Sequence, residues 1–243
     1  MLIAAVLFGS ACGARGVGSS PASSAGPERL ALVYRGDAAC EGCPEAAAAL
    51  LNRTGGFTVR YVGPDGDLAL DATTLAAAAL YVQPGGGDDV ELARRQMDSY
   101  APAIANYVNS GGRYLGICMG AFLAGTVNGF GLWPGEIEEY SGMPNADIHT
   151  DADVLVPVRW GGRDRQMYFQ GGPYFTAPAS TVLARYTNDA IAAFVAPSGR
   201  GRIALVGPHP EAPQSWYTEN ELANPDGIDD APGRELVAAL MAS

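Results

Sequence analysis

Lysine is absent from this sequence, and histidine is nearly absent. All 15 basic residues among the 243 are arginine, and the two histidines are His149 and His209. Without lysine the chain cannot use a Schiff-base lysine, a phosphate-binding P-loop lysine or the usual chemistry of pyridoxal phosphate. Two histidines also exclude a metal site built from three histidines of one chain. Covalent chemistry must therefore use another nucleophile, and we expect neither a cofactor nor a metal.

Positive charge is scarce as well. The chain has 26 acidic residues against its 15 arginines, so its formal net charge is −11 and its sequence pI is near 4.5. A general nucleic-acid binder would show a basic patch. The composition therefore disfavours a nucleic-acid partner, and it leaves the substrate and the oligomeric state open.

The first 27 residues predict an export signal followed by a tether. Residues 1–11, MLIAAVLFGSA, form an apolar run that is too short to span a bilayer as a helix. The run ends in small residues before Cys12, as in bacterial lipoprotein signals, although no basic residue precedes it and Gly9 stands where a bulky aliphatic residue is usual. Residues 12–27 are rich in Gly, Ser and Pro, which predicts a flexible tether.

This pattern predicts an exported protein. It would be lipid-anchored through Cys12 at the outer face of the bacterial cytoplasmic membrane, or secreted, and would meet the membrane only through that anchor. The alternative is that the apolar run is a buried N-terminal strand.

Residues 28–243 predict a single α/β domain. Four short apolar runs predict strands at 30–34, 57–62, 80–83 and 114–117. Helices are expected between them at 44–53 and 90–109, the second bent near Pro102. Strands that alternate with helices at this spacing indicate a doubly wound sheet that is parallel at its centre.

The second half of the domain has a different pattern. Short β-type runs separated by turn residues occur at 154–158, 166–169, 182–186, 190–195 and 203–206. These runs indicate antiparallel strands that extend the sheet. A closing helix is expected at 231–241.

The four cysteines have different expected roles. Cys12 would carry the lipid, and Cys40 and Cys43 form a C-x-x-C pair, which leaves Cys118 alone. In an oxidising compartment the pair can form a disulfide if its local geometry allows it. A zinc site is disfavoured because no second C-x-x-C completes four ligands. A plain thiol pair and a thioredoxin-like redox pair remain as alternatives.

Residues 116–120, GICMG, have the pattern G-x-C-x-G between a predicted strand and a run of small residues. This is the arrangement of a nucleophile elbow with sulfur in place of oxygen. The glycines permit a tight strand-to-helix turn, and a helix beginning at Ala121 would favour the thiolate of Cys118. The alternative is a buried cysteine in a glycine-rich turn.

A second strand end carries the other histidine. His209 and Glu211 follow the predicted strand 203–206 in the sequence GPHPE. Residues two apart on an extended segment project the same way, so Glu211 can orient the imidazole of His209, which would act as a general base. The alternative is a polar histidine at the surface.

A third strand end carries a glycine loop, PGGG, at residues 84–87. An N–H group of Gly86 or Gly87, together with the N–H of Met119, would form an oxyanion hole for a reacting carbonyl. The alternative is a flexible turn. Because sites in open α/β sheets form at the carboxyl ends of strands, the three strand ends together predict one active site.

These motifs resemble the class I glutamine amidotransferase superfamily. The segments VYRGDAACEGC, YVQPGGGDD, RYLGICMGAFLAG, YFQGGPYF and GPHPE are similar, more narrowly, to its biotin-protein-ligase N-terminal-like branch. The resemblance covers nearly the whole chain from Ala31 onward. It implies a flavodoxin-like α/β fold and a Cys-His-Glu triad, in which Cys118 is the nucleophile, His209 the base and Glu211 the orienting carboxylate.

The substrate pocket implied by this resemblance departs from the family at one position. Glutamine-hydrolysing members usually carry Gln two residues after the second glycine of the elbow, and this chain has Phe122 there. Glutamine is therefore a doubtful substrate. Gly171, Gly172 and Tyr174 are expected to form a turn with an aromatic wall near the site, the alternative being an ordinary β-turn.

The leading hypothesis is an exported cysteine-dependent amide (C–N) hydrolase that acts on a small-molecule or peptide amide. One alternative is a non-catalytic envelope lipoprotein of the same fold that binds a ligand or partner. Another is a thiol-redox role for Cys40 and Cys43. Acidic residues alternate with His149 in the loop 147–153, which suits a divalent cation, but acidic solvated loops are commoner, so no metal is predicted.

Overall fold

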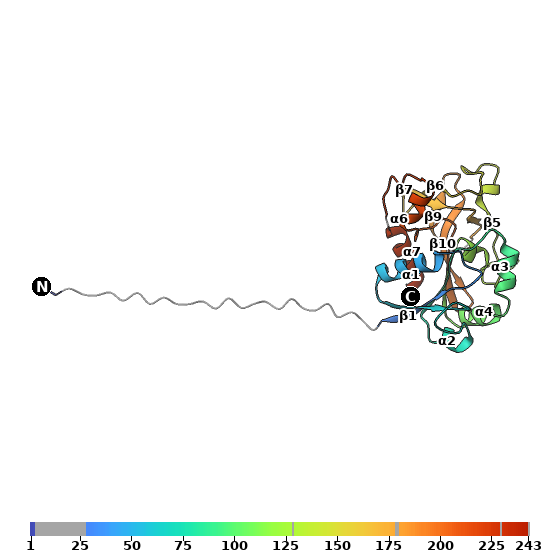
Figure 1. The fold of residues 1–243 in the computed structure, drawn as a ribbon, viewed down its shortest axis with the longest axis horizontal. Coiled ribbons are helices and arrows are strands. Elements are labelled where there is room, and N and C mark those ends of the chain that lie inside the picture. Colours follow the sequence, from blue (N-terminus) through green and yellow to red (C-terminus); the bar gives the residue numbers. More distant parts are fainter. Residues whose placement is uncertain (3–27, 128, 178–179, 229, 243) are drawn as a thin grey trace.

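The computed structural model (Figure 1) describes these stretches of the chain: residues 1–2, 28–127, 129–177, 180–228 and 230–242. Cys12 and the tether lie outside the described residues, as does all of the expected signal except Met1 and Leu2. Within these stretches, no helix has both the length and the apolar character that crossing a membrane requires.

Five parallel strands form the centre of the sheet. They are β1 (Arg29–Tyr34), β2 (Phe57–Val62), β3 (Leu80–Gln83), β4 (Arg113–Ile117) and β11 (Gly201–Val206). Their order is β2-β1-β3-β4-β11, and each pairs in parallel with its neighbour. The carboxyl ends of β3, β4 and β11 therefore lie side by side, since Gly116 pairs with Gln83 and Ile117 with Val206.

Helices cover both faces of this parallel centre (Figure 1). α1 (Cys43–Thr54) and α7 (Ala231–Met241) contact each other and join one buried core. α2 (Ala72–Ala76) and α4 (Ala101–Asn109) belong to a second core, and alternate side chains of β1 point into the two cores. Strands buried on both faces are what a parallel sheet requires. The expected α/β fold with a parallel centre is confirmed.

The prediction of a single helix at 90–109 is wrong. α3 (Val90–Gln96) ends before a turn, and α4 then begins at Ala101 with Pro102 in its first turn. A proline inside a helix removes a hydrogen bond and clashes with the carbonyl four residues earlier, whereas the first turn tolerates it. The chain therefore ends one helix and begins another instead of bending at Pro102.

Four antiparallel strands extend the sheet beyond β11. In order from β11 they are β10 (Ile191–Ser198), β9 (Thr181–Tyr186), β6 (Val154–Trp160) and β7 (Arg163–Phe169). The expected antiparallel extension is confirmed. The sequence pattern does not predict the short elements β5 (Ile137–Glu139), β8 (Pro173–Phe175), η1 (Tyr140–Gly142) and α6 (Gln214–Glu219).

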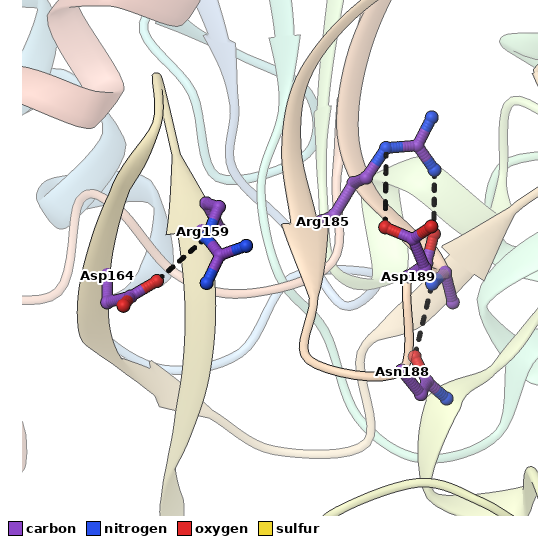
Figure 2. Close-up of polar contacts among 6 residues, drawn as sticks. Arg159, Asp164, Arg185, Asn188 and Asp189 are labelled. Atoms are coloured by element: carbon purple, nitrogen blue, oxygen red, sulfur yellow. Dashed lines mark hydrogen bonds and ion pairs between the residues drawn. The ribbon is translucent and has the colours of Figure 1, made fainter.

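Two arginines lie opposite each other on this extension. Arg159 of β6 pairs in register with Arg185 of β9, where like charges repel. Figure 2 shows the carboxylate that each one meets. Arg159 Nε lies 2.9 Å from Asp164 Oδ1, and Arg185 donates to the carbonyl oxygen of Asp189 at 2.6 Å and lies 4.0 Å from its carboxylate. These contacts offset the repulsion between the two guanidinium groups.

Candidate active site

Cys118 lies at the carboxyl end of β4 in a backbone conformation that is rare for a residue with a side chain. Its φ is 49° and its ψ is −108°. The flanking glycines are required by close packing. A Cβ on Gly116 would lie 2.4 Å from the carbonyl oxygen of Gly120, and a Cβ on Gly120 would lie 2.0 Å from the carbonyl oxygen of Gln83. The chain therefore turns sharply against β3 and holds the thiol at the edge of the sheet.

This turn leads into a very short helix. α5 spans Met119–Phe122, so the helix starts two residues before Ala121, where the sequence pattern places it, and ends almost at once. A helix of one turn has a small dipole, because few peptide units are aligned. The surroundings of the thiol therefore depend more on the neighbouring groups than on α5.

The glycine loop at the end of β3 contacts two other parts of the site. A Cβ on Gly86 would lie 2.7 Å from Met119 Cγ, which is next to Cys118. A Cβ on Gly85 would lie 2.9 Å from His209 Cε1. Glycine is therefore needed for the loop to approach both the elbow and the histidine.

His209 and Glu211 form a buried pair just after β11. His209 Nδ1 lies 2.8 Å from Glu211 Oε1, and the two residues are 5% and 1% exposed. The rings of Tyr168 and Trp216 enclose the imidazole edge-on, with centroids 5.9 and 5.5 Å from its own. The structure therefore excludes a solvated surface role for His209.

The surroundings of His209 favour its charged form. Burial alone lowers the pKa of an imidazole, but the Glu211 carboxylate and the Cys118 sulfur outweigh it and raise the pKa of His209 from 6.5 to about 10. Glu211 Oε2 is buried with no hydrogen-bond partner in the described part of the chain, so the charge of this carboxylate acts mainly on the imidazole. His209 is therefore protonated at neutral pH.

This charge can be measured because the chain has only two histidines. In a His149→Gln variant, the single imidazole signal in an NMR titration belongs to His209. We expect that signal to show a protonated ring up to about pH 9, and a further Glu211→Gln substitution to lower the pKa of His209 by at least about one unit, which corresponds to about 1.4 kcal/mol.

The same shift links His209 to stability. Its pKa is higher in the folded chain than in the unfolded chain, so its contribution to stability is complete below pH 6.5 and is lost as the pH rises through about 10. A His209 signal that titrates near 6.5 both with and without Glu211 would contradict this linkage.

The thiol of Cys118 has a backbone partner besides the histidine. Its Sγ lies 3.5 Å from the carbonyl oxygen of Gln170, to which it donates. The sequence motifs do not reveal this role, because a carbonyl oxygen is present whatever the side chain. They also miss Tyr168 and Trp216, whose rings reach His209 only through the fold.

A cavity of about 310 Å³ opens beside Cys118. Its lining includes the residues expected to form the oxyanion hole and two of those expected in the pocket: Gly86, Gly87, Met119, Phe122 and Gly171. His209 and Glu211 are not among the lining residues, so they lie behind the surface that a ligand would touch. The structure thus brings the three predicted strand ends together around one thiol.

Two of the expected pocket residues lie elsewhere. Gly172 packs against the start of the histidine loop, where a Cβ on it would lie 2.2 Å from the carbonyl oxygen of Gly207. The hydroxyl of Tyr174 donates to Glu138 Oε2 at 3.3 Å. Neither lines the cavity, whereas Asp88, Glu139 and Asp151, which the motifs do not place in the pocket, do.

A disulfide lies next to the glycine loop. Cys40 and Cys43 are bonded, with Cα atoms 5.3 Å apart. The N–H of Cys40 donates to the carbonyl oxygen of Gly85 at 3.0 Å, and a Cβ on Gly85 would lie 3.1 Å from Cys43 Sγ. The disulfide therefore supports the loop that contacts His209.

Removing this disulfide is expected to destabilise the protein. In the double variant Cys40→Ser/Cys43→Ser the unfolded chain gains the freedom of a short loop, for which chain entropy gives about 2 kcal/mol. Denaturant-induced unfolding measures this loss. A reducing agent should lower the stability of the wild type by a similar amount and leave the double variant unchanged. Equal stability of the two oxidised proteins would contradict the prediction.

A larger hollow, of about 590 Å³, lies on the antiparallel extension. Its lining includes four of the residues labelled in Figure 2, Arg159, Asp164, Arg185 and Asp189. In the part of the chain that the structure describes, no cysteine or histidine lines this hollow, and these two arginines already contact carboxylates. The smaller cavity, which Cys118 lines, is therefore the candidate active site.

Apart from Asp151, the polar side chains of the loop 147–153 make contacts within the protein. Tyr140 OH donates to Asp147 Oδ2 at 3.2 Å, and His149 Nδ1 lies 3.1 Å from the carbonyl oxygen of Ser141. Among the residues that the structure describes, no group of three or more His, Cys, Asp or Glu is placed to hold a metal ion.

Comparisons with known proteins agree with this architecture. Residues 30–138 match the family model "Biotin-protein ligase, N terminal". The matched segment includes Cys118 and the glycine loop, and it ends before His209. A biotin–protein ligase of Schizosaccharomyces pombe is 27% identical over 220 residues, an alignment that covers 74% of this chain and 33% of the ligase.

Two solved structures have a similar fold. A proposed GMP synthase component from Thermoplasma acidophilum superposes with a TM-score of 0.55 at 13% identity, covering 88% of this chain and 93% of the other. A glutamine amidotransferase of Methylobacillus flagellatus gives 0.50 at 15% identity, covering 89% and 90%. At such low identity these likenesses concern the fold alone. The chain therefore has the α/β fold of glutamine amidotransferase-like proteins, and a segment of it matches the N-terminal part of biotin–protein ligases.

Proposed function

We propose that this protein is a cysteine-dependent amide hydrolase in which Cys118, His209 and Glu211 form a catalytic triad. The observation that carries the proposal is the convergence of three strand ends. Three features meet beside one cavity: a thiol on a strained elbow, a buried His–Glu pair and a glycine loop. The thiol also raises the pKa of the histidine in that pair. Nucleophile, base and orienting group in this arrangement are the parts that acyl transfer requires.

The first half of the proposed reaction is acylation. The reaction starts with the proton of the Cys118–His209 pair on the imidazole, and the sulfur attacks the amide carbonyl carbon. The oxyanion that forms accepts hydrogen bonds from the N–H of Met119 and of Gly86 or Gly87. His209 then gives its proton to the amide nitrogen, the C–N bond breaks, and the amine leaves a thioester on Cys118.

The second half is hydrolysis of the thioester. A water molecule in the place of the departed amine loses a proton to His209 and attacks the same carbonyl. The C–S bond breaks, the acid leaves, and the proton on His209 restores the starting state. Glu211 stabilises the imidazolium in both halves, which is the role of the third member of a triad.

Glutamine is not the substrate that we propose. Phe122 lines the cavity at the position where glutamine-hydrolysing relatives are expected to carry a glutamine, so this position offers an apolar ring in place of a side-chain amide. The described residues that line the cavity also include no basic side chain for the carboxylate of a free amino acid.

Trapping of the acyl-enzyme tests the proposal. The protein is incubated with a panel of primary amides, γ-glutamyl peptides and cell-wall fragments, and intact-mass measurements follow adducts on Cys118. We expect an adduct and turnover with one class of amide, both lost in Cys118→Ala and both retained in the control His149→Gln. Turnover that survives Cys118→Ala would overturn the proposal.

A non-catalytic role is the second candidate. Cys118 donates to Gln170 O, which keeps the thiol engaged with the protein. A ligand-binding envelope protein would show saturable binding without an adduct or turnover, and its affinity would be unchanged by Cys118→Ala.

We also propose that the protein is exported. The disulfide between Cys40 and Cys43 supports this, because disulfides persist in oxidising compartments. Mass analysis of the protein from its native membrane fraction tests the proposal, since lipidation would leave an acylated Cys12 at the mature N-terminus. An unprocessed N-terminal Met1 in the cytoplasm would contradict it.

A further inference from the structure

The cavity beside Cys118 carries charge of one sign. Among the residues that the structure describes, its charged lining residues are Asp88, Glu139 and Asp151, and neither arginine nor histidine lines it. All three are exposed at its rim. Glu139 accepts a hydrogen bond from the hydroxyl of Ser141. Asp88 and Asp151 make no hydrogen bond or ion pair with any residue that the structure describes, so their charges are not neutralised by the protein.

Apart from Cys118 and the polar residue Gln170, the rest of the lining is apolar or glycine. Val90, Met119 and Phe122 contribute hydrophobic side chains, and the glycines contribute peptide groups. A small pocket with an apolar wall and a few charged groups selects ligands by those groups. Here the wall suits a hydrocarbon stem, and the rim suits a cation at the end of that stem.

We infer that Cys118 acts on amides that carry a protonated amine or a guanidinium group close to the scissile bond and no carboxylate there. This inference rests on the proposed function and specifies its substrate class. Clefts lined by charge of one sign raise the local concentration of oppositely charged ligands and their rate of entry. The same carboxylates repel an anionic substrate, and they attract the amine product once it is protonated.

The charge of the site can be tested without a known substrate. Methanethiosulfonates modify a thiol as a mixed disulfide and exist as matched reagents of either charge. We compare the cationic 2-aminoethyl, the anionic 2-sulfonatoethyl and the neutral methyl reagent, each corrected for its rate with a free thiol. Mass mapping assigns the adduct to Cys118. We expect the cationic reagent to react about tenfold faster than the anionic one, or more, and this ratio to fall with added salt.

Variants identify the groups responsible. In Asp88→Asn/Glu139→Gln/Asp151→Asn the ratio should fall close to one while the neutral reagent reacts at the wild-type rate, which shows that the elbow is still folded. A single Asp88→Asn substitution should lower the ratio in part. Asp164→Asn, which removes one carboxylate on β7 outside the cavity lining, is the matched control and should leave the ratio unchanged.

Matched amides complete the test. One amide is prepared with an ammonium group, a neutral hydroxyl or a carboxylate at the same position, and the rates of acyl-enzyme formation are compared. We expect the order cation, neutral, anion, and the loss of this order in the triple variant. A wild-type reagent ratio near one, or equal rates for the three amides, would overturn the inference even if Cys118 is acylated. A high reagent ratio with no acyl-enzyme from any amide would overturn the proposed function and leave a cation-selective cavity.

Discussion

Alkylation of Cys118 by iodoacetamide at pH 7 is expected to slow about tenfold or more when His209 is replaced by alanine. The thiolate is the reactive form, and an unassisted thiol is only a few per cent ionised at this pH. In the wild type, the Cys118 sulfur acts on His209 and raises the pKa of the imidazole, and in the proposed triad the charged imidazole assists the attack by sulfur. The measurement follows the rate of adduct formation on Cys118 by mass spectrometry from about pH 5.5 to about pH 9.5, which extends about one unit below the ordinary imidazole pKa and about one unit above the ordinary thiol pKa.

The pH dependence of the alkylation rate shows whether His209 acts on Cys118 through its charge or only supports the local structure. In His209→Ala the rate should rise about tenfold per pH unit until an ordinary thiol is ionised, near pH 8.5. The wild type should show a shallower rise. Glu211→Gln should fall between the two, because it keeps the imidazole and removes the charge that holds its proton. His149→Gln is the control. Equal rates for the wild type and His209→Ala across this range would contradict the triad.

Gly120→Ala is expected to cost about 3 kcal/mol of folding free energy or more. Its Cβ would lie 2.0 Å from the carbonyl oxygen of Gln83 in β3, and a backbone atom inside a sheet cannot move away as the end of a flexible side chain can. Overpacking of this kind usually costs about 1–3 kcal/mol, and more when the contact is with rigid backbone. Denaturant-induced unfolding and the yield of folded protein measure the effect.

Gly142→Ala provides the matched control. A Cβ at Gly142 would meet nothing within 4 Å, and the residue is exposed at the end of η1. We expect its stability to stay within about 0.5 kcal/mol of the wild type. If Gly120→Ala were as stable as Gly142→Ala, the close approach of the elbow to β3 would be wrong.

The sequence predicts the parallel half of the fold well, because its strands are short apolar runs bounded by glycine and proline. The runs at 57–62 and 80–83 coincide with β2 and β3, and the closing helix at 231–241 coincides with α7. Short elements escape prediction since they carry too few residues for a periodic pattern. β5 and β8 have three residues each, and they form through pairing in the folded sheet, β5 with β8 and β8 also with β10.

The residues of the candidate site also fall into those that the sequence predicts and those that it does not. Cys118, His209, Glu211 and the glycine loop lie at strand ends, where motif and position can be recognised along the chain. Tyr168 and Gln170 belong to the segment YFQGGPYF, but no local pattern assigns the Gln170 carbonyl or the rings of Tyr168 and Trp216 a place beside Cys118 and His209. The acidic rim is missed for another reason. Asp88, Glu139 and Asp151 are ordinary surface carboxylates in sequence, and only the fold places them around one opening.

The elbow packs tightly against β3, so its glycines cannot be replaced, whereas the side chains at the rim of the cavity can. The position of the nucleophile depends on peptide groups packed against peptide groups, at distances that leave no room for a side chain on Gly116 or Gly120. The rim depends on exposed side chains whose replacement disturbs no packing. Selection, natural or in the laboratory, can therefore retune the molecules this cavity accepts with little penalty in stability, while the elbow itself stays fixed. Libraries that aim at new specificity should randomise the rim and leave the elbow glycines unchanged.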